Sequence, residues 1–113
     1  MNLQFFAKIP EEKFTKYALD PSKDPDKARA FQDALGYNKE NYEKLIANIK
    51  SHINESKFVE KGDKGHGMRY EYVVELTGEN GKKANVLTAW IEDNGEKRMT
   101  SAYVTKKKVT EWR

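Results

Sequence analysis

The hydrophobic pattern of this chain changes its period once, near Ser56, and this change limits the fold more than any other feature of the sequence. After Ser56, apolar and polar residues alternate in the runs MRYEYVVEL, KKANVLTAWIE and KRMTSAYVT. Helices followed by alternating strands predict an α+β domain. Before Ser56 the clearest helical stripe, with the spacing i, i+3, i+4, i+7 and i+11, consists of Tyr42, Leu45, Ile46, Ile49 and Ile53.

Capping residues set the limits of three predicted helices. Proline suits the first position of a helix, so a short helix can span Pro10–Leu19. Asp24 and Pro25 have the pattern of an N-cap followed by the first helical residue, and Gly36 is placed to end this second helix. Asn38 is expected to cap the third helix, which carries the apolar stripe.

Two Asn-Gly dipeptides, Asn80-Gly81 and Asn94-Gly95, separate the alternating runs. A type I′ turn needs positive φ at both central residues, and Asn-Gly is its strongest sequence signal. Phe58 and Val59 could add a short edge strand. We therefore predict three N-terminal helices packed on one face of an antiparallel β-meander of three to four strands.

Two-residue turns would fix the register and sort the strand residues between two faces. The face expected under the helices carries Tyr72, Val74, Leu76, Leu87, Ala89, Ile91, Ala102 and Val104. The face expected to stay open carries Arg69, Glu71, Thr88, Trp90, Ser101 and Tyr103. A slip of one residue in either hairpin would invert the strand concerned.

The length of 113 residues is enough for one domain with one modest core. We expect an apolar N-terminal segment at 1–9, a single α+β domain at 10–105 and a basic C-terminal tail at 106–113. The net charge of +3 permits nucleic-acid binding without requiring it.

The sequence offers no strong metal or cofactor site. It contains no cysteine, which excludes disulfides and thiolate metal sites. Two histidines, His52 and His66, are too few for a zinc site built on histidine alone. We therefore predict neither a metal ion nor a cofactor.

The start of the chain, MNLQFFAKIP, has a short apolar patch that includes Leu3, Phe5 and Phe6. It lacks the long apolar region of a secretion signal, and no stretch approaches the roughly 20 residues needed to span a membrane. We expect a cytoplasmic protein of a bacterium or a phage-infected host, delivered outside only if a delivery system carries it. Two interpretations of the patch remain open: an anchor packed on the domain, or a docking peptide for a protein partner.

The expected open face has the side chains that an RNA-cleaving site needs. Arg69 could neutralise a phosphate, and Trp90 or Tyr103 could stack on a base. Glu71 or His66 could take the proton of a 2′-hydroxyl while the other protonates the leaving oxygen. Further residues are expected to act in catalysis, Ser101 and Tyr103, and in substrate binding, Thr88, Lys82 and Lys83. The alternative is a solvated sheet face without a ligand, which is common in antiparallel sheets.

His66 lies between two glycines, Gly65 and Gly67, directly before the first long alternating run. Glycines permit positive φ and close approach to a ligand. They also leave a loop flexible, which suits a lid better than a preorganised base. His66 is therefore either a catalytic residue on a lid or a polar turn residue.

Several segments resemble an uncharacterised bacterial domain that commonly ends large polymorphic toxins and phage head-associated proteins. The resemblance runs from about Phe14 to Tyr103 and is carried by KARAFQDALGY, GMRYEYVVELTGENGKKANVLTAWI and RMTSAYV. The opening MNLQFFA is also similar to starts of phage and mobile-element proteins. The resemblance implies a toxin-type domain with RNA as target and an immunity, phage or host protein as partner.

Helices followed by an antiparallel sheet are also similar in architecture to the barnase–EndoU–colicin–RelE grouping of metal-independent ribonucleases. This is an analogy of fold. It implies a cleft on the open sheet face lined by His66, Arg69, Thr88, Ser101 and Tyr103. The sequence thus supports two hypotheses: a metal-independent ribonuclease, or a non-enzymatic module that docks through MNLQFF.

Overall fold

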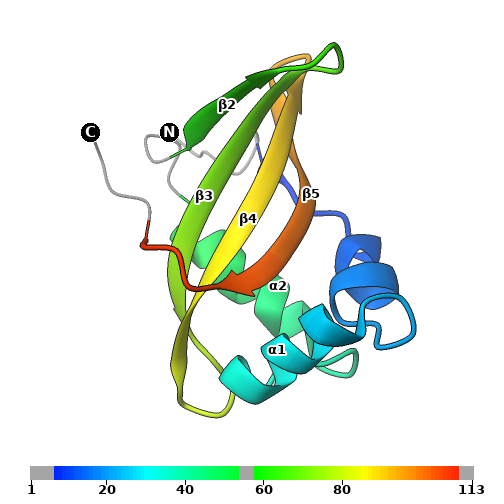
Figure 1. Cartoon of the computed structure of the whole chain (residues 1–113), viewed down its shortest axis with the longest axis vertical. Coiled ribbons are helices and arrows are strands. Elements are labelled where there is room, and N and C mark those ends of the chain that lie inside the picture. Colours follow the sequence, from blue (N-terminus) through cyan, green and yellow to red (C-terminus); the bar gives the residue numbers. More distant parts are fainter. Residues whose placement is uncertain (1–6, 54–57, 110–113) are drawn as a thin grey trace.

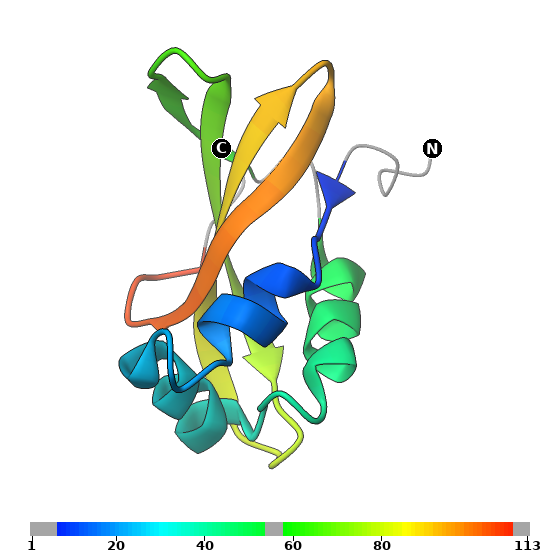
Figure 2. The same cartoon turned by 90° about the vertical axis from the view of Figure 1, so that its right-hand side faces the viewer.

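In the part of the chain that the structure describes, five strands form one mixed sheet, and the helices pack against one of its faces (Figures 1 and 2). The computed structural model describes residues 7–53 and 58–109, so the Leu3, Phe5 and Phe6 patch lies outside it. The elements in chain order are β1 (Ala7–Lys8), the π-helix η2 (Phe14–Ala18), α1 (Pro25–Leu35), α2 (Tyr42–His52), β2 (Val59–Asp63), β3 (Met68–Thr77), β4 (Lys83–Asp93) and β5 (Glu96–Thr105).

The strand order in the sheet is β1-β5-β4-β3-β2. Strands β2 to β5 pair antiparallel with their neighbours, whereas β1 pairs parallel with β5. The predicted α+β class is confirmed. A purely antiparallel meander is not the whole sheet, because the two residues of β1 add a parallel edge that no alternating pattern could reveal.

Local capping explains where the helices begin and end. The Asp24 carboxylate accepts the N–H of Lys27 at 3.1 Å, and Pro25 is the first residue of α1. Gly36 ends α1 with φ of +76°. The predicted cap at Asn38 is wrong, because α2 begins three residues later with Asn41 as its N-cap. Asn38 instead forms the preceding turn, where its side chain accepts the N–H of Glu40 at 2.8 Å.

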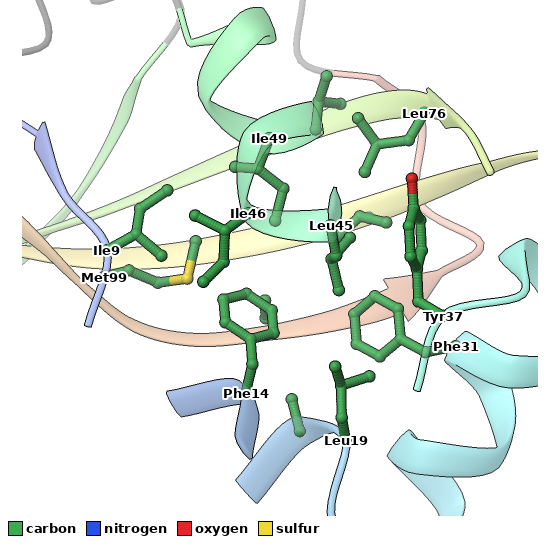
Figure 3. Packing of buried hydrophobic residues seen from close by; sticks show 14 of the residues in the cluster. Ile9, Phe14, Leu19, Phe31, Tyr37, Leu45, Ile46, Ile49, Leu76 and Met99 are labelled. Atoms are coloured by element: carbon green, nitrogen blue, oxygen red, sulfur yellow. The ribbon is translucent and has the colours of Figure 1, made fainter. Parts of the chain in front are cut away.

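The core lies between the three helices and one face of the sheet (Figure 3). The predicted stripe of the third helix faces this core, and Leu45 and Ile49 are almost fully buried. Large, fully buried side chains from other parts of this core are Phe14, Leu19, Phe31, Leu35, Tyr37, Leu76, Val86, Trp90 and Met99.

The hairpin at Asn80-Gly81 has a three-residue loop in place of the predicted two-residue type I′ turn. The N–H of Gly78 donates to the carbonyl of Lys82 at 2.8 Å, and only Gly81 of the two turn residues has positive φ (+81°). This is the pattern of a longer loop that ends in a left-handed glycine. The loop also rests on α1, because the N–H of Asn80 donates to the carbonyl of Leu35 at 3.4 Å.

The extra loop residue shifts the β3–β4 register by one position. Glu71 pairs with Ala89 and Tyr70 pairs with Trp90, whereas two-residue geometry predicted Glu71 opposite Trp90. Because side chains alternate along a strand, the shift exchanges the two faces of β4. The predicted placement of Thr88 and Trp90 on the open face is therefore wrong. The β4 residues predicted under the helices but found on the opposite face are Leu87, Ala89 and Ile91.

The second hairpin behaves as predicted at its turn. Asn94 and Gly95 both have positive φ, at +53° and +79°, and Trp90 pairs with Met99. The pairing then shifts between Trp90 and Ala89, because Thr100 is an extra residue on β5. The first loop exchanged the predicted faces of β4, and this bulge exchanges the faces once more for the rest of β5. The residues Ser101, Ala102, Tyr103 and Val104 therefore lie on the faces predicted for them.

Gly78 should be intolerant of a side chain. A Cβ atom there would lie 2.1 Å from the carbonyl oxygen of Leu35, so α1 and the loop would have to separate. We expect Gly78→Ala to lower the free energy of unfolding by about 1–3 kcal/mol, as overpacking does elsewhere. Urea unfolding followed by circular dichroism measures this loss. Gly81→Asn is the matched control, because Gly81 faces open space and Asn tolerates positive φ. Equal stability of the two variants would contradict the tight contact.

Candidate functional site

We call the sheet face opposite the helix-covered core the outer face. Its cross-strand rows follow from the observed pairing. One row runs from Arg69 through Ile91 to Arg98, and the next runs from Glu71 through Ala89 to Ser101. The third row consists of Val73, Leu87 and Tyr103.

A shallow depression of about 130 Å³ lies on the outer face. Ala89 lies between Glu71 and Ser101 in its row, and its small side chain leaves space on the surface of the sheet. Thr100, the bulge residue, borders the depression and donates its hydroxyl to the carbonyl of Ala89 at 3.2 Å. The full lining consists of Lys61, Arg69, Tyr70, Glu71, Ala89, Trp90, Ile91 and Thr100.

The Arg69 guanidinium is held at the edge of the depression by β2. Its Nε donates to the carbonyl of Gly62 at 3.3 Å, and Nη2 donates to the carbonyl of Lys61 at 3.2 Å. The β2–β3 pairing is irregular between Glu60 and Gly62, which leaves Lys61 as an extra residue of β2. These bonds use two of the five N–H groups of the guanidinium and fix its position before any ligand arrives.

Glu71 supplies the carboxylate of the depression. Its side chain is 29% exposed, and Oε1 lies 4.0 Å from Nζ of Lys107. Lys61 and Arg69 line the same depression as Glu71, and Lys107 lies against the Glu71 carboxylate, so three cationic side chains accompany one anionic side chain. This balance of charge favours an anionic ligand.

The structure brings together four of the predicted site residues. Arg69 and Glu71 line the depression, Ser101 lies beside it across Ala89, and Tyr103 lies in the next row. The ring of Tyr103 also receives the Lys27 ammonium, which lies 5.3 Å from the ring centroid.

Three other predicted site residues lie apart from this group. His66 is exposed on the loop between β2 and β3, and five residues, or roughly 15 Å of extended chain, separate it from Glu71. Lys82 and Lys83 are exposed beside the first hairpin loop, at the opposite end of β3 from Arg69. That separation is about 25 Å along the strand.

Thr88 and Trp90 are core residues. Trp90 is 1% exposed, and its indole N–H donates to the Thr88 hydroxyl at 2.8 Å. The Thr88 hydroxyl in turn donates to the carbonyl of Tyr72 at 2.7 Å. The expectation that Trp90 stacks on a nucleobase is therefore wrong. Tyr103 is the predicted stacking residue that remains on the outer face.

Sequence reasoning missed Lys61, Thr100 and Lys107. Lys61 and Thr100 reach the depression because each is the extra residue of an irregular strand pairing, and neither irregularity has a local sequence signal. Lys107 falls in the segment expected to be a basic tail. The correct register alone would have found Ala89 between Glu71 and Ser101.

Two kinds of feature are absent from residues 7–53 and 58–109. No helix there is long and apolar enough to cross a membrane. In the same part of the chain, no group of three or more His, Cys, Asp or Glu side chains could hold a metal ion.

Fold and site together define a small α+β domain with a charged depression on the outer face of its sheet. A family model described as a domain of unknown function (DUF6883) matches residues 4–111. The chain therefore belongs to that family. No curated protein and no solved structure matches the chain.

Proposed function

We propose that this chain is a toxin-type domain of phage or mobile-element origin that cleaves RNA without a metal ion at the outer-face depression. The observation that carries the proposal is the pairing of a fixed guanidinium with a carboxylate: Arg69 and Glu71 border one hollow among further cations. The toxin and phage origin is supported by the sequence resemblance alone.

The proposed reaction is a transesterification. The oxygen of a 2′-hydroxyl attacks the adjacent phosphorus, and Glu71 accepts the hydroxyl proton. The bond from phosphorus to the 5′-oxygen breaks, and this oxygen takes a proton from water. Arg69 and Lys61 neutralise the charge that develops on the phosphate oxygens. The products carry a 2′,3′-cyclic phosphate and a 5′-hydroxyl.

Arg69→Ala should weaken RNA binding much more than it weakens the fold. The lost charge-assisted hydrogen bonds should lower affinity for a 2′-O-methyl RNA, which cannot be cleaved, by about 10- to 100-fold. Stability should change by only about 1 kcal/mol, because the bonds of Arg69 are exposed. Fluorescence anisotropy and thermal unfolding measure the two effects. Arg29→Ala, which removes an exposed arginine from α1, is the matched control. Unchanged binding with a clear loss of stability would make Arg69 a structural residue.

Growth of bacterial cells tests the toxin role. Induced expression of the wild-type chain should arrest growth and degrade cellular RNA, whereas Arg69→Ala at equal expression should permit growth. Equal growth of the two cultures, with intact RNA in both, would contradict the toxin proposal.

A further inference from the structure

The segment 106–109, which follows β5, lies across the outer face. In Figure 1 it runs in red across the front of β4 and β3, while α2 lies on the far side of the sheet. Two side chains of the sheet contact it. The Asn85 amide donates to the carbonyl of Lys107 at 3.0 Å, and the Glu71 carboxylate lies 4.0 Å from the Lys107 ammonium.

The anchor of this segment lies next to buried apolar side chains. Val73 and Leu87 are paired on the outer face, away from the helices, and yet they are 5% and 1% exposed. Asn85 is the next outer-face residue of β4 beside Leu87, so the segment that it holds passes close to this pair. Burial of the two side chains favours the attached position of the segment.

The turn before Lys107 fixes its direction. The backbone N–H of Lys107 donates to the hydroxyl of Thr105 at 3.1 Å, and Thr105 pairs with Asn85 at the end of β5. Backbone contacts on both sides of Lys107 therefore aim its side chain toward Glu71. Lys106 and Lys108, the neighbours on either side, are exposed.

We infer that Lys107 is a phosphate-binding residue of the site and that the C-terminal segment is one of its walls. This inference rests on the proposed function and names a substrate contact at the same depression. An RNA phosphate between Arg69 and Lys107 would sit beside Glu71, where the cations offset the repulsion from the carboxylate. Lys107 pairs with Glu71 in the free protein and with the phosphate in the complex.

Binding of a labelled 2′-O-methyl RNA over a range of salt concentrations tests the inference. Lys107→Ala should weaken binding about tenfold and lower the slope of log affinity against log salt by roughly 0.7, the value for one phosphate contact on a single strand. Lys107→Arg should restore most of the affinity. Asn85→Ala, which removes no charge, should also weaken binding because the segment loses its anchor.

Lys106→Ala and Lys108→Ala are the matched controls, since they remove the same charge from the same segment. If Lys107→Ala loses no more RNA affinity than these controls, the inference is overturned. The proposed function still stands in that case if the wild-type chain cleaves RNA. If the wild-type chain neither binds nor cleaves RNA, the proposed function fails, and the inference fails with it. The melting temperatures of Lys106→Ala, Lys107→Ala and Lys108→Ala should be almost the same as that of the wild type. A largely exposed ion pair such as the one between Lys107 and Glu71 adds little stability. A marked fall for Lys107→Ala alone would assign Lys107 a structural role.

Discussion

Glu71→Gln should slow RNA cleavage by about 10²- to 10⁴-fold, the usual contribution of a positioned general base. Glutamine keeps the shape of the side chain but cannot accept the proton of the 2′-hydroxyl. RNA binding should persist, because the substitution also removes a negative charge from a cationic depression. Single-turnover cleavage of a short RNA measures the rate, and the chemical ends of the products identify the cyclic phosphate.

The same assay separates Glu71 from His66 as the base. His66 is exposed on a glycine-containing loop beyond the end of β3, so His66→Ala should change the rate by no more than about threefold. A large loss for His66→Ala with normal cleavage by Glu71→Gln would move the base to the loop. Wild-type cleavage should continue in excess chelator. Activity that disappears with EDTA and returns with magnesium would rule out the proposed mechanism.

Trp90→Ala should cost about 3–5 kcal/mol of unfolding free energy, as large core truncations do. Trp90 is among the largest fully buried side chains, and Phe58 packs edge-on against its ring, with the centroids 5.3 Å apart. The substitution also removes the N–H that donates to Thr88. Urea unfolding followed by circular dichroism is the appropriate measurement, because its signal does not depend on the indole that the variant loses.

Two variants make this a test of the face assignment. Trp90→Phe keeps an aromatic ring and should lose about 1 kcal/mol for the hydrogen bond, plus a smaller packing loss. Ile91→Ala alters the next residue, which faces outward and is partly exposed, and should cost under about 2 kcal/mol. A greater loss for Ile91→Ala than for Trp90→Ala would mean that β4 presents the opposite face to the helices.

Local sequence signals predicted the elements better than the way they pair. The stripe of α2, the Asp24-Pro25 start of α1 and the Asn94-Gly95 turn depend on neighbouring residues, and all three were predicted correctly. The Asn80-Gly81 loop depends on contact with Leu35, which is 45 positions away from Asn80. A short-range pattern contains no information about that contact.

The candidate site shows the same division. Arg69 and Glu71 belong to β3, whose faces did not depend on the first loop, and both lie on the predicted face. Trp90 belongs to β4, whose two faces are exchanged relative to the prediction because the Asn80-Gly81 loop has one extra residue. Lys107 reaches the site because the chain crosses the sheet after β5. The alternation of apolar and polar residues along a strand cannot predict that crossing.

The loop at Gly78–Lys82 and the bulge at Thr100 have different consequences for how this sequence can vary. A deletion in the loop would shift the β3–β4 register by one position and turn Thr88 and Trp90 outward. A deletion of Thr100 would leave Met99 opposite Trp90 and Ser101 opposite Ala89, so the faces of β5 would stay as they are. We therefore expect functional relatives to keep the length of the loop and to tolerate loss of the bulge residue.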